Sequence, residues 1–335
     1  MKTRKIGNLE VSNVGMGCMG FSHGYGKVPE KEYSVEAIRK AYASGCTFFD
    51  TAETYGREQF WPGHNEQIVG EAIRPFRESV VLATKLHIED GELNLGEETE
   101  QIIRRHLKKS MENLQTDWID LYYLHRINEK VPMEEVAEAM GKLIAEGKIR
   151  GWGLSQVGVD TIRKVQHITP LTAVQNLYSM VERGVEEELM PYLLENNIGL
   201  VAFSPVGSGL LSGKIDKDTV FEKTDDVSHF IPQVKKENIE GNQPIVDLLR
   251  KFAELKNATP AQMCMAWMIH KYPNTVPIPG SKNQERILEN LQAGSIELTE
   301  EEFTELEAQL NSCQVFGHRG FEESQNKSFS RNWRK

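Results

Sequence analysis

Short apolar segments alternate with longer amphipathic segments along most of the chain. The apolar runs have the length of buried strands, and the segments between them place apolar residues at helical spacing, as at Ile103, Leu107 and Met111. Eight strand candidates follow one another in this way, at residues 14–16, 47–50, 80–85, 119–124, 149–154, 173–174, 198–203 and 275–278. Strict alternation predicts a parallel sheet, and eight units favour a closed (α/β)8 TIM barrel over an open sheet.

A small β-hairpin is expected in residues 1–13, ahead of the first barrel unit. Gly7 and Asn8 supply a turn between the extended segments 4–6 and 9–11. After the last strand, helical spacing predicts two more helices, at 283–291 and 300–310. Barrels of this kind occupy this length as one domain, so we expect a single domain over 1–335.

Two segments break the alternation. Residues 204–244 contain charges, prolines and glycines, and they follow the seventh strand on the face where long loops are expected. A loop of this length in a compact domain is usually functional or disordered, so we interpret it as a lid, although a solvated insertion fits the composition equally well. The tail at 317–335 is polar and aromatic without periodicity, and it predicts no element.

Side chains suited to catalysis stand at the ends of three successive strand candidates. Asp50 ends the second strand, Lys85 ends the third, His125 follows the fourth, and Tyr55 comes five residues after Asp50. In a parallel barrel these strand ends share one face, where such folds place their active sites. Taken singly, each residue could be structural: an ion pair, a rim aromatic or a buried histidine. Their occurrence together favours a catalytic site.

Composition and charge indicate which kind of molecule this protein is expected to bind. The 335 residues are 39% hydrophobic and 26% charged, with a net charge of −10 and a pI near 5.5. These values are typical of a soluble globular protein and argue against a nucleic-acid or membrane surface, so a small-molecule partner is expected. The four cysteines lack paired spacing, and neither a signal peptide nor a membrane-length run is present, so we expect a cytoplasmic location. The nine histidines lack ligand spacing, which gives a metal site no support.

Two glycine-rich stretches resemble phosphate-binding motifs but lack the necessary context. Residues 15–20 match a dinucleotide fingerprint, yet a glycine-rich loop follows where a helix should begin, and Glu36 falls within a helical pattern. We therefore expect these glycines to allow close packing at the barrel rim. Residues 208–215 lack the first glycine and the final hydroxyl residue of a P-loop.

The motifs at the strand ends resemble the aldo-keto reductase superfamily from one end of the chain to the other. In chain order they are Phe49-Asp50-Thr51-Ala52 with Tyr55-Gly56, Thr84-Lys85, Asp120-Leu121-Tyr122-Tyr123-Leu124-His125-Arg126, Gly153-Leu154-Ser155, Gln175-Asn176, Phe203-Ser204-Pro205, and Ile278-Pro279-Gly280-Ser281 with Arg286 and Asn290. The resemblance implies an (α/β)8 barrel that binds a nicotinamide cofactor without a Rossmann domain. It also implies reduction of an aldehyde or ketone, sugar-derived compounds included.

By this resemblance, four residues perform the chemistry. Tyr55 is expected to protonate the carbonyl oxygen as hydride arrives, and Lys85 to lower the high pKa of the phenol. Asp50 is expected to hold Lys85 charged, and His125 to orient the carbonyl in its neutral form. A cofactor-binding regulatory or sensor subunit, like the channel-associated β subunits of this superfamily, is the alternative. A hydrolase is disfavoured because Asp50 faces an expected lysine rather than a second acid.

The resemblance also implies NADPH as cofactor and assigns its contacts. Ser155, Gln175 and Asn176 would bind the nicotinamide carboxamide, and Phe203 would stack on the ring where many relatives have tyrosine. The remaining cofactor residues are Gly209, Leu211 and Lys214 along the pyrophosphate, Ser281, Lys282 and Arg286 at the 2′-phosphate, Glu289 and Asn290 at the adenine, and Ser204, Pro205 and Gly280 without an assigned contact. The 204–244 segment would then cover the cofactor.

The substrate pocket is the least determined part of the site. The sequence departs from common relatives at 57–62, which lengthens the loop after Tyr55. We expect either a pocket lining or rim packing for the aromatic residues and the histidine Tyr25, Phe60, Trp61, His87 and Trp118.

Overall fold

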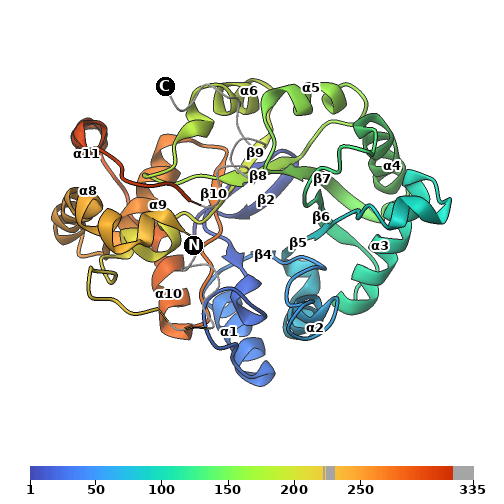
Figure 1. Ribbon diagram of the computed structural model, residues 1–335, viewed down its shortest axis with the longest axis horizontal. Helices are drawn as coiled ribbons and strands as arrows, with labels where there is room; N and C mark the ends of the chain where they lie inside the picture. The colour runs from blue at the N-terminus through green and yellow to red at the C-terminus, as the bar shows by residue number, and fades with distance from the viewer. Residues whose placement is uncertain (222, 224–230, 320–335) are drawn as a thin grey trace.

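Eight parallel strands occupy the centre of the molecule, and helices surround them (Figure 1). This computed structural model describes residues 1–221, 223 and 231–319. Each strand pairs with its neighbours in sequence, in the order β3 to β10. The strands are β3 (Met16–Gly17), β4 (Phe48–Asp50), β5 (Val81–Leu86), β6 (Ile119–Leu124), β7 (Ile149–Ser155), β8 (Ala173–Leu177), β9 (Gly199–Phe203) and β10 (Thr275–Pro277).

Contacts between the first and last strands close the sheet into a barrel. A parallel bridge joins Gly17 to Gly280, and the Gly15 amide donates to the carbonyl of Pro277 at 2.9 Å. A Cβ atom on Gly17 would lie only 2.9 Å from the carbonyl oxygen of Ile278, so a larger residue would push the two ends apart. Gly15 and Gly17 therefore serve close packing, in agreement with the expectation from the sequence, whereas a Cβ atom on Gly20 would lie no nearer than 3.8 Å to another residue.

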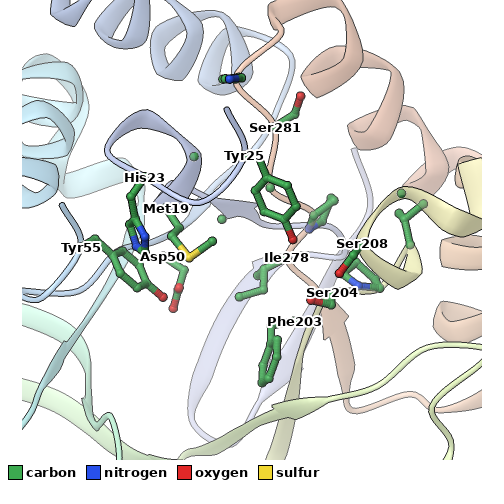
Figure 2. Close-up of a pocket in the computed structure, with 18 of the residues that line it drawn as sticks. Met19, His23, Tyr25, Asp50, Tyr55, Phe203, Ser204, Ser208, Ile278 and Ser281 are labelled. Atoms are coloured by element: carbon green, nitrogen blue, oxygen red, sulfur yellow. The ribbon is translucent and has the colours of Figure 1, made fainter. Parts of the chain in front are cut away.

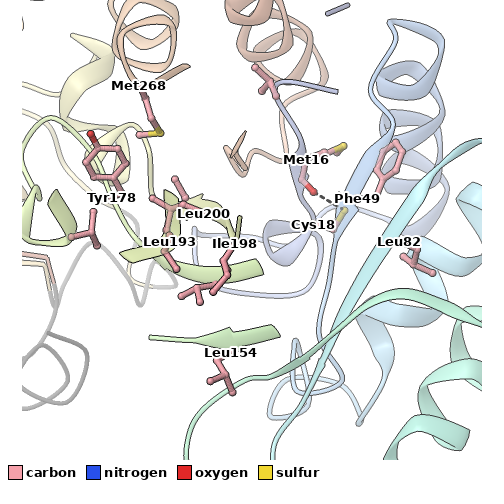
Figure 3. Close-up of a cluster of buried hydrophobic side chains, with 14 of the residues drawn as sticks. Met16, Cys18, Phe49, Leu82, Leu154, Tyr178, Leu193, Ile198, Leu200 and Met268 are labelled. Atoms are coloured by element: carbon pink, nitrogen blue, oxygen red, sulfur yellow. Dashed lines mark hydrogen bonds between the residues drawn. The ribbon is translucent and has the colours of Figure 1, made fainter. Parts of the chain in front are cut away.

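The helices cover the outside of the barrel and bury an apolar layer against it (Figures 1 and 3). Figure 3 shows part of this layer, where Leu193 and Met268 come from helices and Phe49, Leu154 and Leu200 from strands. The α-helices are α1 (Lys31–Ala43), α2 (His64–Ile73), α3 (Thr99–Leu114), α4 (Met133–Ala145), α5 (Val159–Gln166), α6 (Leu189–Glu195), α8 (Lys236–Leu255), α9 (Pro260–Lys271), α10 (Gln284–Gln292) and α11 (Glu300–Ser312). Short 3₁₀ helices are η1 (Met19–Phe21), η2 (Arg74–Ser79), η3 (Glu92–Leu95), η4 (Gly184–Glu186), η5 (Gly207–Ser212), η6 (Pro232–Val234) and η7 (Ala293–Ser295).

An N-terminal hairpin closes the amino end of the barrel. Its strands are β1 (Thr3–Ile6) and β2 (Leu9–Ser12), and its apolar residues join the core inside the barrel. Ile6 packs so tightly on Gly199 that a Cβ atom there would lie 2.4 Å from the isoleucine side chain. Arg4 donates to the carbonyl of Thr275 at 2.6 Å. Because the hairpin fills the amino end of the barrel, a functional site is expected at the carboxyl ends of the strands.

The barrel, its order of elements and the hairpin confirm the predicted fold, with one correction. The expected long loop at 204–244 is wrong in its extent, because η5, η6 and the start of α8 at Lys236 lie inside it. Pro244 stands within α8 rather than in a loop. Residues 222 and 224–230 of this segment, and 320–335 of the expected tail, lie outside the described residues. No helix in the described ranges is both long and apolar enough to cross a membrane.

Candidate active site

A pocket of about 950 Å³ opens at the carboxyl ends of the strands (Figure 2). Tyr55 and Asp50 lie on one side of it, and Phe203, Ser204 and Ser208 lie on another. Its walls come from the ends of successive strands and from the loops that follow them. A barrel places such residues together because its parallel strands all end on the same face.

The structure brings Asp50, Tyr55, Lys85 and His125 together: Asp50, Tyr55 and His125 line this pocket, and Lys85 is buried in contact with the first two. The Lys85 ammonium donates to Oδ1 of Asp50 at 2.5 Å, to the carbonyl of Thr51 at 2.8 Å and to the Tyr55 phenol oxygen at 3.1 Å. The ring of His125 meets the ring of Tyr55 edge-on, with centroids 5.7 Å apart. Parallel pairing of β4, β5 and β6 sets these positions side by side.

Lys85 is a charged group sealed inside the protein, with an exposed fraction of 0%. Burial alone would lower the pKa of Lys85, but the Asp50 carboxylate and the Tyr55 phenol outweigh burial and raise that pKa above its ordinary value. The amine therefore stays protonated, and it can donate all three hydrogens as the geometry requires. Gln175 completes the pairing by donating to the other oxygen of Asp50 at 2.8 Å.

The Tyr55 phenol does not have the lowered pKa that the sequence predicted. Burial raises the pKa of Tyr55 above its ordinary value, and the charge of Lys85 opposes this shift only in part. The expectation of a net lowering is therefore wrong for this arrangement, in which the half-buried ring lines the pocket and lies 5.6 Å from the ring of His23. At neutral pH the phenol is protonated.

His125 is held as a neutral ring. Burial lowers the pKa of His125 far below its ordinary value, and the nearby cations Arg126 and Lys85 lower it further. Its Nδ1 lies 3.3 Å from the hydroxyl of Thr54. A neutral imidazole that uses Nδ1 in this contact keeps Nε2 for another partner.

The inner half of the expected cofactor site lies next to these four residues. Ser155, Gln175, Phe203, Ser204 and Pro205 all line the pocket. Ser204 takes a left-handed backbone conformation with φ 53°, which turns the chain sharply at the end of β9.

The outer half extends toward the start of α10 and contains the cations Lys214, Lys282 and Arg286. Gly209 and Lys214 line it from the segment after β9, and Gly280, Ser281, Lys282, Arg286, Glu289 and Asn290 line it from the segment after β10. Asn283 caps α10 by accepting from the Arg286 amide at 2.8 Å. A long groove with cations and a helix N-terminus at its far end fits a phosphate-bearing dinucleotide.

Two expected cofactor residues do not reach the pocket. Asn176 is fully buried, and its amide group holds Val157 by contacts of 3.2 Å to the amide and 2.9 Å to the carbonyl. Because side chains alternate along a strand, Asn176 faces away when its neighbour Gln175 faces the pocket. Leu211 has an exposed fraction of 0% and packs in the apolar core. Neither side chain therefore lines the pocket, and the assignment of both residues to the cofactor stays a prediction.

The expected substrate residues separate into one that faces the pocket and four that do not. Tyr25 lines the pocket and points into it (Figure 2). Phe60 and Trp61 stay on the rim, 42% and 49% exposed, where Phe60 stacks on His64 at 4.0 Å. The amide of His87 donates to Glu53 at 2.7 Å, and this residue does not line the pocket.

Trp118 lies at the opposite end of the barrel, which corrects its assignment to the substrate pocket. It precedes β6, so it stands at the amino end, whereas residues that follow a strand stand at the carboxyl end. There its ring stacks under Arg77 at 4.3 Å and its indole nitrogen donates to Asp120 at 3.3 Å.

Several pocket residues were not anticipated from the sequence. Arg126 follows His125 directly, and this position in the motif was the one available signal. Others come from β3 and η1, at Gly17, Met19 and Gly20, or from segments between helices and strands, among them His23, Gln59, Gln156, Ile215, Phe221 and Arg319. Within the described residues, no group of three or more His, Cys, Asp or Glu side chains is arranged to hold a metal ion.

Comparison with known proteins agrees with this geometry. The model of the aldo/keto reductase family matches residues 13–311. A probable aldo-keto reductase 1 from Glycine max is 35% identical over 302 residues, which cover 89% of this chain and 85% of that protein.

Solved structures give the same result. A glycerol dehydrogenase from Gluconobacter oxydans superposes with a TM-score of 0.81 and 26% identity, covering 92% of this chain and 94% of its own. An aldo/keto reductase from Klebsiella pneumoniae, solved in complex with NADP and acetate, superposes with a TM-score of 0.72 and 27% identity, covering 96% and 99%. The chain therefore belongs to the aldo/keto reductase family.

Proposed function

We propose that this protein uses NADPH to reduce an aldehyde or ketone to the alcohol, with Tyr55 as the general acid. Its family consists of oxidoreductases, and the Klebsiella pneumoniae relative was solved with NADP, which supports this cofactor. The observation that carries the proposal is the 3.1 Å contact between the Lys85 ammonium and the Tyr55 phenol, on the floor of a pocket open to small molecules.

The direction of this hydrogen bond decides what the phenol can do. Lys85 has only hydrogens to donate, so the Tyr55 oxygen accepts from it and keeps its own hydrogen for a substrate. NADPH, when bound, supplies the hydride to the carbonyl carbon. As negative charge develops on the carbonyl oxygen, Tyr55 gives up its proton, and Lys85 stabilises the phenolate that is left. Proton transfer by a positioned acid contributes about 10²–10⁴-fold to a rate.

His125 is suited to hold the same carbonyl oxygen. A Thr54 hydroxyl that donates to Nδ1 leaves the ring hydrogen on Nε2, from which it can donate to the substrate. The lowered pKa of His125 keeps the ring neutral, so it polarises the carbonyl without competing with Tyr55 as the proton source.

The pocket has groups that fit each part of NADPH. Ser155 and Gln175 would bind the carboxamide, and Phe203 offers a ring face to the nicotinamide. Lys282 and Arg286 would bind the 2′-phosphate with charge-assisted hydrogen bonds. This placement favours NADPH over NADH, which has no such phosphate.

The test is NADPH oxidation by the purified protein against aldehydes, ketones and sugars, with Tyr55→Phe measured beside it. We expect turnover that falls by about 10²–10⁴-fold in the variant while its affinity for NADPH is kept. Tyr42→Phe removes a phenol oxygen elsewhere, on a ring stacked on Phe76 at 3.8 Å, and serves as the matched control.

Two other outcomes would count against the proposal. Cofactor binding without turnover on any carbonyl would favour a regulatory or sensor subunit. Full activity in Tyr55→Phe would remove Tyr55 from the role of acid.

A further inference from the structure

Arg126 brings an uncompensated positive charge to the pocket. It follows His125 after β6 and lines the same cavity. Its Nη1 donates to the Ser155 hydroxyl at 3.0 Å and to the carbonyl of His125 at 2.5 Å. Neither acceptor carries a charge, so within the described residues this guanidinium has no carboxylate partner.

The rest of the guanidinium has no hydrogen-bond partner among the described residues. Within the described part of the chain, both hydrogen bonds of Arg126 use Nη1. Its Nε and Nη2 make no hydrogen bond to a described residue and do not belong to the polar atoms that are buried without a partner, so both keep some exposure in this half-buried side chain. Two donors left on one planar group match the two oxygens of a carboxylate.

The acids that line the pocket are already engaged or distant from Arg126. Asp50 receives hydrogen bonds from Lys85 and Gln175. Glu289 accepts from Thr259 and lies 3.6 Å from Lys214, in the outer half of the groove. Glu58 is exposed on the rim loop. A buried charge without a partner is costly, so an anionic ligand would gain by binding here.

Arg126 also lies close to the proposed reacting atoms. It is the chain neighbour of His125, and its charge acts on the Tyr55 phenol. A carbonyl oxygen held by Tyr55 and His125 would therefore place nearby substituents of the same molecule next to Arg126. Its burial makes its charge more effective there than on a solvated surface.

We propose that the substrate is a carbonyl compound that carries a carboxylate near its carbonyl group, and that Arg126 binds this carboxylate. The inference rests on the proposed reductase function and specifies its substrate class. Arg57 lines the same pocket but is ion-paired with Glu89, so it makes a matched comparison.

Matched substrates test the proposal directly. We would measure kcat/KM with NADPH for 4-oxobutanoate and its methyl ester, and for 2-carboxybenzaldehyde and its methyl ester. We expect at least one acid to be preferred over its ester by roughly tenfold or more, and Arg126→Gln to abolish that preference. The ester rate in each variant measures general damage to the site. Arg57→Gln should keep the preference.

Preference for both esters in the native protein, or a preference for the acid that survives Arg126→Gln, would overturn the proposal. A binding measurement separates this failure from failure of the proposed function. On the NADPH-loaded protein, butanoate should bind roughly tenfold tighter than butanamide, and Arg126→Gln should remove the difference. Equal binding would reject the carboxylate site even if no carbonyl is turned over. Absence of turnover with butanoate bound through Arg126 would reject the reductase function alone.

Discussion

The two ends of the barrel each hold a carboxylate that is sealed from solvent and paired with a cation. At the carboxyl end, Asp50 is 2% exposed and pairs with Lys85. At the amino end, Asp120 is 0% exposed and pairs with Arg77 at 2.7 Å and Arg150 at 3.0 Å. Both arrangements pair a buried carboxylate with a cation, yet only the one at the carboxyl end includes a hydrogen bond to a residue of the proposed active site.

The two ion pairs differ in the other groups to which the cation donates hydrogen bonds. At the amino end the donors converge on Asp120, including the Leu82 amide at 3.0 Å, and Arg77 donates its other hydrogens to backbone carbonyls and to Thr116. The hydrogen bonds of that network therefore end on backbone groups and side chains of the protein. At the carboxyl end, Lys85 also donates a hydrogen bond to the phenol oxygen of Tyr55, which lines the pocket. A buried ion pair becomes chemically useful when one of its hydrogen bonds ends on a group that a ligand can reach.

Removing the cation at the carboxyl end should have the largest effect on activity. Lys85→Met leaves Tyr55 without the charge that stabilises its phenolate, and we expect kcat to fall by about 10²–10⁴-fold in a steady-state NADPH assay. The variant also leaves Asp50 without its cation. The double variant Lys85→Met with Asp50→Asn should therefore recover stability without recovering activity, and kcat within tenfold of the native value in either would contradict this role.

Removing a cation at the amino end should affect stability instead. We expect Arg77→Met to lower the free energy of unfolding by about 3 kcal/mol, because it strips a buried carboxylate of a partner, while kcat/KM stays unchanged. Urea denaturation followed by circular dichroism measures the loss. Arg150 is 54% exposed, so Arg150→Met should cost less, about 1 kcal/mol. A fall in kcat/KM for Arg77→Met in the folded protein would show that the two ends are coupled.

The smallest effect is expected in the pH dependence of kcat/KM, which should stay flat near neutral pH. Burial and the neighbouring cations hold the pKa of His125 far below its ordinary value, so the ring stays neutral as pH falls from 8 to 6. We expect kcat/KM to be constant over this window at fixed ionic strength and to fall only at lower pH. A half-loss near pH 6.5 that disappears in His125→Gln would show that the imidazole titrates normally.

The sequence located Asp50, Lys85 and His125 because each stands at or just after the end of an apolar run, and it located Tyr55 through the loop that follows Asp50. Parallel strands that end on one face bring Asp50, Lys85 and His125 together without any knowledge of side-chain packing. The catalytic roles stay a prediction. Trp118 could have been excluded by the same logic, because it precedes its strand and must lie at the other end.

Other features depend on packing that the sequence does not display. Whether Gln175 or Asn176 faces inward follows from the register of β8, which neighbouring strands decide. The raised pKa of Tyr55 reflects how deeply the finished barrel encloses it, and this burial outweighs the nearby Lys85. The placement of Phe60 and Trp61 follows from the turn conformation of the rim loop, for which the sequence shows no signature.

Closure of the barrel through Gly17 and Gly280 has a consequence for how activity arises during synthesis. The ribosome completes the segment from Asp50 to His125 early, but the groove also needs β3 to join the segment after β10, and α10 to follow. Contacts between distant parts of a chain form late because closing a long loop costs entropy. A nascent chain therefore carries its reactive residues for most of its translation without a pocket around them, and the ability to bind cofactor arises in one step near the end.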